Sequence, residues 1–521
     1  MRADLYHSSC YNLLKMSALI RRYKISLLFL FAFSIRLISL NQSLWLDEAT
    51  TAMAVKTYSY IDIITQFSPA DFHPPLYYLV MKMWTGIFGY SEMALRMPSI
   101  LFSLAAGWMV YKVGELMKDK TVGFWAAAFF LFNPLIVYYS QEARMYSMVT
   151  FTVAATFYYF LRIIHTKEKN VDTKDFLLMN LFLVVSFYTF YASAFYIGSI
   201  WLYLFTQKKL KLAIYSIFVF ILPLILISPL LYEQLQNSRV ALMQVTNWSS
   251  VLGNVSLKNI VLIPIKFTSG RISFEPKIIY YALAGGWMMM MMMIMVSFPI
   301  IRALFQQRDS RLRGNDKRGL GITLFFFIMP LIIGLIFSFF SPMLQYFRFQ
   351  YLIIFLSIIL GFVSSFDSIF SQLGRAPSVR FAHGSRIVRK MESSFMSQTF
   401  IRFIFVVGFI SWSLLYLIFP QFHREDWKSF AAQIEKEQAP IYMIPSSSDP
   451  LKYYAPNTKI HSLKTFDVNS LSKDIIIIPY TADIHGINYS VILQDKYYMN
   501  QSISFRQLTY EKWNVNLTNE N

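Results

Sequence analysis

The chain has 521 residues, of which 55% are hydrophobic and only 15% are charged, and its mean hydropathy is +0.43. A water-soluble fold cannot bury that much apolar surface, so the composition excludes an ordinary soluble protein and predicts a multi-span membrane protein. The single cysteine, Cys10, excludes a disulfide framework and a cysteine-based metal site. The basic N-terminal segment lacks an apolar core followed by a cleavage site, so we expect no removable signal peptide.

Apolar stretches long enough to cross a bilayer recur along most of the chain. A membrane-spanning helix needs roughly 17–25 mostly apolar residues. About eleven stretches meet this need, near residues 24–40, 93–111, 121–138, 146–164, 176–190, 191–206, 212–231, 278–301, 320–340, 349–370 and 400–420. The two stretches within 176–206 are also compatible with one long helix that bends around residues 188–192.

The net charge of +19 is distributed unevenly among the connections between these stretches. Connections at 41–92, 139–145 and 341–348 hold few cations and more acids, whereas the alternate connections are rich in Lys and Arg. Because cytoplasmic loops carry the excess of Lys and Arg, we expect an inner-membrane protein with a cytoplasmic N-terminal segment, 1–23. Residues 41–92 then form the first external loop. The positive charge reflects membrane topology, and we expect no nucleic-acid partner.

The last hundred residues are soluble in character. Residues 424–438 have the pattern of an amphipathic helix, and 441–444 and 475–478 have the pattern of buried strands. We therefore predict an all-α polytopic membrane protein with a small C-terminal extracytoplasmic α/β domain. The expected boundaries are 24–420 for the membrane domain and 421–521 for the C-terminal domain.

Two adjacent acids, Asp47 and Glu48, follow the first apolar stretch. Acids at an external helix end are often simply solvated. Here Trp45 resembles an interfacial anchor, which would hold the two carboxylates at the depth of the lipid headgroups. We predict that Asp47 and Glu48 are catalytic, with a carboxylate acting as general base.

Two further external segments offer polar groups to the same face of the membrane. His73 precedes two prolines, which rule out a helical entry to the next apolar stretch. Glu142 and Arg144 lie in a connection too short to extend far from the membrane. His73 can equally cap a helix, and Glu142 with Arg144 can form an ordinary surface ion pair of little energetic worth. We nevertheless expect all three to contact donor or acceptor.

Arg36, Arg96 and Arg348 lie at or near the outer ends of apolar stretches. Extension of the side chain to lipid headgroups is one explanation. The other is that they bind the phosphate of a lipid-linked donor, because a guanidinium group suits bidentate contact with phosphate.

At these positions the chain resembles the bacterial members of the dolichyl-phosphate-mannose–protein mannosyltransferase superfamily, GT-C-type membrane enzymes that include the lipid A aminoarabinose transferases. The resemblance is carried by several segments in the expected order. They are Trp45-Leu46-Asp47-Glu48, His73-Pro74-Pro75-Leu76-Tyr77-Tyr78, Glu92-Met93-Ala94-Leu95-Arg96-Met97-Pro98, Tyr139-Ser140-Gln141-Glu142-Ala143-Arg144, Tyr346-Phe347-Arg348 and Arg424-Glu425-Asp426-Trp427-Lys428.

The resemblance implies a glycosyltransferase whose donor is a sugar on a polyprenyl phosphate, used on the outer face of the membrane. It implies that Asp47 removes a proton from the acceptor hydroxyl as this attacks the anomeric carbon with inversion. Arg96, Arg144 or Arg348 would offset the charge of the leaving phosphate, and Tyr346 would belong to the same binding region. The acceptor is a lipid, a glycan or a protein, and no metal or other cofactor is implied.

One position departs from the family pattern. Many relatives carry a His between the fifth and sixth spans, where this chain has Thr189-Phe190-Tyr191. A shifted substrate preference, or a non-catalytic scaffold, is compatible with that change. A flippase for a lipid-linked glycan would need ionisable residues near mid-span and a doubled architecture, neither of which is evident. A ligase for a diphosphate-linked glycan would need a strongly basic external loop, and 232–277 is only modestly basic.

Overall fold

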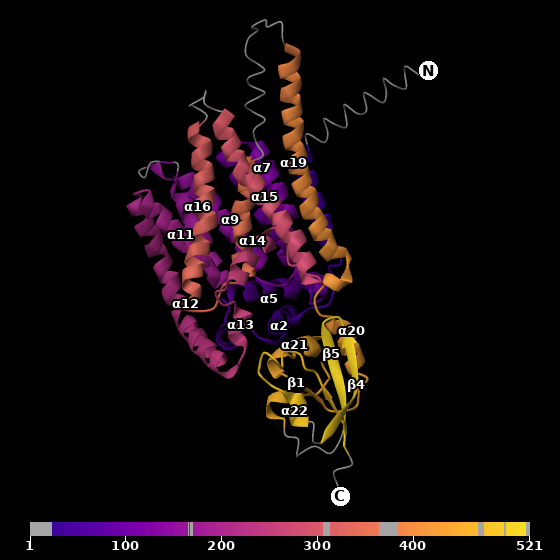
Figure 1. Cartoon of the computed structure of the whole chain (residues 1–521). Helices are drawn as coiled ribbons and strands as arrows, with labels where there is room; N and C mark the ends of the chain where they lie inside the picture. The colour runs from indigo at the N-terminus through magenta and orange to yellow at the C-terminus, as the bar shows by residue number, and fades with distance from the viewer. Residues whose placement is uncertain are drawn as a thin grey trace.

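The computed structural model describes residues 23–164, 166, 170–305, 313–363, 384–466, 474–493 and 496–516. The predictions made for residues 1–22, and for parts of the basic connections at 306–319 and 371–399, fall outside these residues. The described chain forms a bundle of helices with a small mixed sheet at one end (Figure 1).

The bundle is built from a first helix at residues 23–36 and from helices that follow it in the chain. These are α6 (Glu92–Met117), α7 (Lys120–Phe132), α8 (Pro134–Ser140), α9 (Tyr146–Ile164), α10 (Thr173–Thr189), α11 (Ala194–Thr206), α12 (Leu210–Gln244), α14 (Leu257–Ser269), α15 (Lys277–Phe305), α16 (Arg313–Ser338), α17 (Ile353–Val363) and α19 (Gly384–Ile418).

Five helical segments within the described residues are long and apolar enough to cross a membrane. They are Glu92–Met117, Tyr146–Ile164, Leu210–Gln244, Gly319–Ser338 and Phe400–Ile418. The bent pair of α7 and α8 is a sixth if it forms one span. The chain is therefore a multi-pass membrane protein. The expected spans at these places are confirmed, while the count of eleven stays a prediction.

The region 176–206 forms two helices and not one. Helix α10 ends at Thr189, and a short 3-10 turn, η3 (Tyr191–Ser193), leads into α11. Phe190 between them has an extended backbone with φ −160° and ψ 116°. Both helices have fewer than 18 residues, so neither counts among the five spans.

The sharpest bend in the bundle follows from one dipeptide, Asn133-Pro134. Proline cannot continue a helix and disfavours helical geometry in the residue before it, so α7 stops at Phe132 and α8 leaves at 60°. The Asn133 side chain accepts hydrogen bonds from the amides of Leu135 and Ile136, at 3.0 and 3.3 Å. These bonds satisfy the free amides at the start of α8, the helix that leads to residues 141–144.

The segment 41–92, which the sequence predicts to be the first external loop, is largely helical. It contains α2 (Leu46–Thr57), α3 (Tyr60–Asp62), a π-helical turn η1 (Ile63–Phe67), α4 (Ser68–Asp71) and α5 (Leu76–Phe88). Residues 72–75 are not helical, as the two prolines predict, and Pro75 is the N-cap of α5. Helices α2 and α5 lie between the bundle and the C-terminal sheet (Figure 1).

The C-terminal unit, residues 420–516, contains a five-stranded sheet in the order β2-β1-β3-β5-β4. Strands β1 (Ile441–Met443), β2 (Ile460–Ser462) and β3 (Ile475–Ile477) are parallel, and β5 (Leu508–Val515) runs antiparallel to β3 and to β4 (Tyr497–Phe505). Alternate residues of β1 and β3 lie in two separate hydrophobic clusters, so the sheet buries both faces.

The strands expected at 441–444 and 475–478 are confirmed within a residue. The helix expected at 424–438 is much shorter: α20 spans only Trp427–Ile434. The Asp426 side chain accepts a hydrogen bond from the amide of Ser429 and fixes the helix start. The other helices here are α21 (Asp449–Tyr454) and α22 (Tyr489–Leu493).

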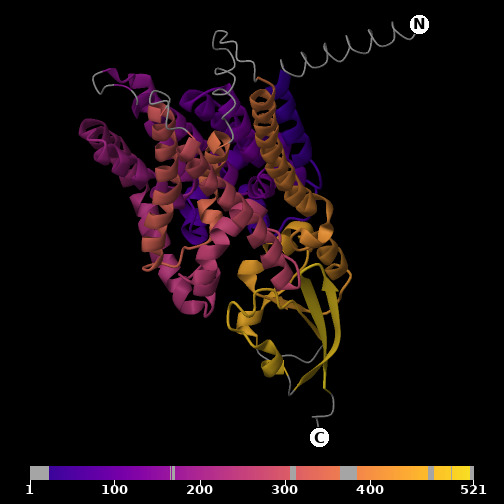
Figure 2. The ribbon, with the colours of Figure 1, turned by 45° about the horizontal axis from the view of Figure 1, so that its top comes forward.

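The C-terminal unit packs directly against the segment 41–92. The Tyr454 hydroxyl accepts a hydrogen bond from the Leu44 amide at 2.9 Å, and Thr50 donates to Asp449 at 2.9 Å. Figure 2 shows the unit in contact with the same end of the bundle from a second direction. The unit therefore touches α2, the helix that carries Asp47.

Candidate active site

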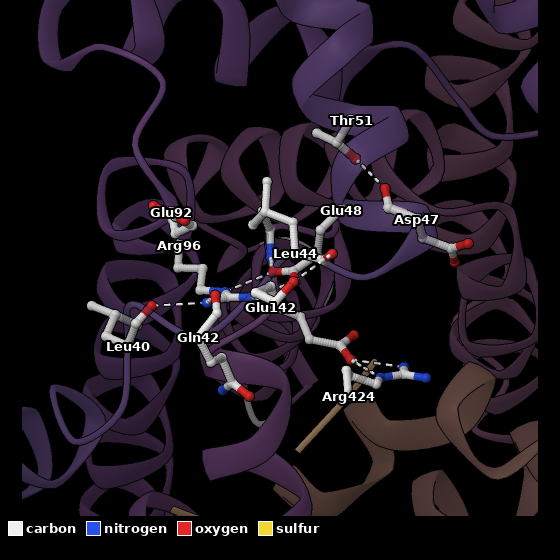
Figure 3. A network of polar contacts seen from close by, with 12 residues as sticks. Leu40, Gln42, Leu44, Asp47, Glu48, Thr51, Glu92, Arg96, Glu142 and Arg424 are labelled. Atoms are coloured by element: carbon white, nitrogen blue, oxygen red, sulfur yellow. Dashed lines mark hydrogen bonds and ion pairs between the residues drawn. The ribbon is translucent and has the colours of Figure 1, made fainter. Parts of the chain in front are cut away.

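Asp47 and Glu48 occupy the first turn of α2, directly after its N-cap Trp45. The positive end of the helix dipole stabilises carboxylates at this position. Consecutive helical residues point in different directions, and these two side chains diverge (Figure 3). The Glu48 side chain is 1% exposed, whereas that of Asp47 is 36% exposed.

Glu48 is bound to Arg96 on helix α6. The Arg96 Nε donates to Glu48 Oε1 at 2.8 Å, and Nη2 donates to Oε2 at 2.6 Å. The remaining guanidinium protons of Arg96 go to the carbonyls of Leu40, Gln42 and Ser43. These five bonds use every donor that an arginine has. Arg96 and Glu48 thus hold the segment that leads from the first helix into α2.

Glu48 also connects α2 to the short loop that contains Arg144. Its Oε1 accepts a hydrogen bond from the amide of Ala143 at 2.8 Å. Breaking a buried ion pair of this kind leaves an uncompensated charge, which typically costs about 3–5 kcal/mol. The pair therefore fixes where Asp47 lies relative to Arg144.

Arg144 is the buried cation beside Asp47. The Arg144 Nη2 lies 3.7 Å from the Asp47 Oδ2, and the arginine side chain is 2% exposed. Its Nη1 donates to the Tyr78 hydroxyl at 3.2 Å and lies 3.5 Å from the Thr51 hydroxyl. Asp47 is the member of this pair that remains open to a ligand.

His73 lies on the other side of Arg144. Its Nδ1 is 2.9 Å from Asp71 Oδ2, and its Nε2 is 3.5 Å from Arg144 Nη2. Burial raises the pKa of Asp71, but His73, Arg144 and Tyr78 outweigh it and hold that pKa below its ordinary value. Asp71 thus stays charged and orients His73.

Glu142 is enclosed by two arginines that come from distant parts of the chain. Arg424, which precedes α20, donates to Glu142 Oε1 from Nη2 at 2.9 Å and from Nε at 3.3 Å (Figure 3). Arg271, which follows α14, places its Nη1 3.6 Å from the same oxygen. Burial raises the pKa of Glu142 to about 8, although Arg271 lowers it.

Arg271 and Arg424 both pack against aromatic rings. The Arg424 guanidinium lies 3.5 Å from the centre of the Trp45 ring. Arg271 lies 5.3 Å from the centre of the Tyr138 ring and donates a hydrogen bond to the Tyr138 hydroxyl. Trp45, which the sequence suggests as a lipid anchor, is thus also a stacking platform for an arginine.

The last two predicted residues lie near this cluster, on a 3-10 turn η4 (Tyr346–Leu352). Tyr346 lies beside Arg271 and Tyr139. Within the part of the chain that the structure describes, the Arg348 guanidinium has one hydrogen bond, to the Pro342 carbonyl at 3.3 Å. Burial lowers the pKa of Arg348, so an anion placed beside it would stabilise its charge.

Arg36 does not join the cluster. Its side chain is fully buried in the bundle and donates to the carbonyl of Ala32, the hydroxyl of Ser103 and the carbonyl of Leu131. The structure therefore brings Asp47, Glu48, His73, Arg96, Glu142 and Arg144 into one connected network and places Tyr346 and Arg348 at its edge.

Sequence reasoning did not single out Asp71, Arg271, Arg424 or Glu425 as parts of the site. The Glu425 carboxyl group is buried, which raises its pKa, and the Tyr480 hydroxyl lies 3.3 Å from it. A lone acid or arginine in a long external segment carries no signal of what it packs against. Among the described residues, no group of three or more His, Cys, Asp or Glu is arranged to hold a metal ion.

Part of the chain is similar to a known protein family. Residues 72–232, which include His73, Arg96, Glu142 and Arg144, match the family model for dolichyl-phosphate-mannose-protein mannosyltransferase. A comparison with curated protein sequences found no match.

Two solved structures of ArnT from Cupriavidus metallidurans share the fold over nearly the whole chain. The apo form aligns with a TM-score of 0.55 at 11% identity, covering 94% of this chain and 98% of ArnT. The form bound to undecaprenyl phosphate aligns with a TM-score of 0.54 at 11% identity, covering 94% and 97%. The family match over residues 72–232 and the fold shared with ArnT support membership of the GT-C mannosyltransferase-type superfamily and indicate a membrane glycosyltransferase.

Proposed function

We propose that the protein transfers a sugar from a polyprenyl-phosphate-linked donor to a hydroxyl of a lipid, glycan or protein acceptor, with inversion at the anomeric carbon. The observation that carries the proposal is the contrast between Asp47 and its neighbours. Glu48, Arg96, Glu142 and Arg144 are buried and bound to protein groups, whereas the Asp47 carboxylate is partly exposed.

Asp47 is the general base in this proposal. It takes the proton of the acceptor hydroxyl while the oxygen forms a bond to the anomeric carbon of the sugar. The bond between that carbon and the phosphate oxygen breaks, and the polyprenyl phosphate leaves. Arg144 holds the base, and Glu48 with Arg96 positions the helix that carries it. Positioned proton transfer of this kind contributes typically about 10²–10⁴-fold to a rate.

The phosphate of the donor would be bound by cations that the protein leaves partly available. Arg271 is 31% exposed, and the Arg348 guanidinium makes a single hydrogen bond among the described residues. Arginine suits phosphate because its planar donors match two oxygens at once. That ArnT was crystallised with undecaprenyl phosphate supports a phosphate-linked polyprenyl donor here. Arg96 and Arg36 act within the protein and would not contact the donor.

The reaction would occur on the outer face of the inner membrane. The alternation of basic and acidic connections supports a cytoplasmic N-terminus and an external C-terminal unit, residues 421–521. Membrane lipid surrounds the apolar helices in this arrangement.

The proposal is tested by transfer of radiolabelled sugar from a panel of polyprenyl-phosphate donors, with membranes that contain wild type, Asp47→Asn or Asp62→Asn. Asp62 is a matched control because it is a half-buried acid of the same loop, and its side chain takes part in the capping box that starts α3. We expect the wild type and Asp62→Asn to transfer the sugar of one donor in the panel. We expect the rate of transfer by Asp47→Asn to be at least about 100-fold lower.

Near-normal transfer by Asp47→Asn would remove Asp47 as the base. Transfer from none of the donors by the wild type would reject the proposed reaction and make translocation of a lipid-linked glycan the next assay.

A further inference from the structure

Arg424 contacts two residues that lie far from it in the chain, Trp45 and Glu142. It lies on the segment between helix α19 and helix α20, far in the chain from the first external loop. The central carbon of its guanidinium lies 3.5 Å from the centre of the Trp45 ring, and its Nε and Nη2 both donate to Glu142 Oε1. The side chain is 14% exposed.

The two partners of Arg424, Trp45 and Glu142, each lie two residues before a member of the Asp47–Arg144 pair. Trp45 is the N-cap of α2, two residues before Asp47. Glu142 is two residues before Arg144, whose Nη2 lies 3.7 Å from Asp47. Arg424 thus joins the start of α2 to the 141–144 loop, in parallel with the bond from Ala143 to Glu48.

The backbone around Arg424 is itself held by the C-terminal sheet. The Arg506 side chain, in the turn between β4 and β5, donates to the Arg424 carbonyl at 2.7 Å. The Asp426 amide donates to the Arg506 carbonyl, and Gln507 donates to the His423 carbonyl. A continuous set of contacts therefore runs from the sheet through Arg424 to both sides of the Asp47–Arg144 pair.

We infer that Arg424 is a positioning residue of the transfer reaction, through which the C-terminal unit sets the spacing of Asp47 and Arg144. The inference rests on the proposed function. Arg424 contacts the Trp45 ring through its guanidinium while Nε and Nη2 both donate to Glu142 Oε1. Lysine has neither the planar group nor two donors in fixed positions, so it cannot replace arginine here. The C-terminal unit is then required for the correct geometry of the catalytic centre.

The test compares Arg424→Lys, Arg424→Ala and the control Lys512→Met in purified full-length protein. Lys512 pairs with Glu437 in the same unit, at 2.8 Å, away from the contacts of Arg424. We expect both Arg424 variants to lose about 10–100-fold in kcat, while the apparent KM for the donor changes less than about three-fold, because a misplaced base slows chemistry more than binding. Binding of undecaprenyl phosphate should be unchanged, and Lys512→Met should match the wild type.

Chemical rescue separates positioning from a general structural role. Methylguanidinium should restore activity to Arg424→Ala, because it can occupy the space between Trp45 and Glu142, and methylammonium should not. Full activity of Arg424→Lys overturns the inference. So does an Arg424→Ala protein that elutes as a monodisperse species and transfers poorly but is not rescued. If the wild type itself transfers no sugar, the proposed function is rejected instead.

Discussion

At the scale of single residues, some charged side chains of the site bind other protein groups, whereas others remain accessible to a ligand. Asp47 and Glu48 are adjacent, yet Glu48 is buried against Arg96 while Asp47 remains partly exposed. The 100° step between helical neighbours is enough to produce this difference. The same distinction separates Arg96, whose donors are all used within the protein, from Arg348.

Glu142 gives a prediction about stability and pH. Burial raises its pKa to about 8 from an ordinary value of 4.5. The folded protein therefore binds more protons than the unfolded chain between these pH values, and stability falls as the pH rises from about 4.5 to about 8. Glu142→Gln removes this dependence. We expect the Tm of the variant minus that of the wild type to increase from pH 6 to pH 8. The corresponding difference in the free energy of unfolding changes by up to ~1.4 kcal/mol per pH unit.

Glu437→Gln is the control for that measurement. Burial raises the pKa of Glu437, but hydrogen bonds from Lys512 and Tyr510 outweigh it and leave the pKa below its ordinary value. Its contribution to stability is present above pH 4.5 and is lost only as the pH falls further. The Tm difference between Glu437→Gln and wild type should stay constant from pH 6 to pH 8. A constant difference for Glu142→Gln as well would contradict the raised pKa.

At the scale of elements, the breaks between helices bring the site residues together. The Asn133-Pro134 bend directs α8 toward the 141–144 loop, and the end of α14 brings in Arg271. Gly270, the C-cap of α14, has φ 75° and ψ −165°, a conformation that is essentially restricted to glycine. A Cβ on Gly270 would lie 2.9 Å from the Cβ of Pro134. The two breaks therefore pack against each other.

Gly270→Ala should consequently lower stability and displace Arg271. Backbone strain of this kind costs about 1–3 kcal/mol. We expect a lower Tm and weaker binding of undecaprenyl phosphate, both measured in detergent. Gly285→Ala is the matched control, because Gly285 lies within helix α15 with no atom within 4 Å of its added Cβ. That variant should be as stable as wild type or slightly more stable. Equal Tm values for the two variants would show that the Gly270 turn accommodates a side chain.

At the scale of the whole molecule, the orientation in the membrane decides which substrates can reach the site. The distribution of Lys and Arg predicts that the C-terminal unit is outside and that the connection between α11 and α12 is cytoplasmic. Both can be labelled, since Lys464 and Gln207 are exposed. The chain has a single cysteine, Cys10, which can be replaced by serine.

In a Cys10→Ser background, we expect Lys464→Cys to react with a membrane-impermeant maleimide in spheroplasts. We expect Gln207→Cys to react only after the membrane is permeabilised. Reaction of Gln207→Cys in sealed spheroplasts would reverse the predicted topology and put the site on the cytoplasmic face.

Composition and local sequence patterns are enough to predict the class of protein and much of its local structure. Apolar stretches set by bilayer thickness located the spans at 93–111, 146–164, 212–231, 320–340 and 400–420, and the two prolines after His73 marked the non-helical entry to α5. These features depend on short-range composition and backbone chemistry, which a linear sequence displays.

Which charged side chains contact each other depends on how distant segments pack together. Arg271 and Arg424 converge on Glu142 from positions 129 and 282 residues further along the chain, and Arg96 closes on Glu48 across 48 residues. Only the packing of distant segments brings such groups within about 4 Å of each other, and nothing in the local sequence around them indicates the partner. Whether a cation is buried and paired or accessible to a ligand is therefore a property of the fold, because burial and pairing set the free energy of a charge.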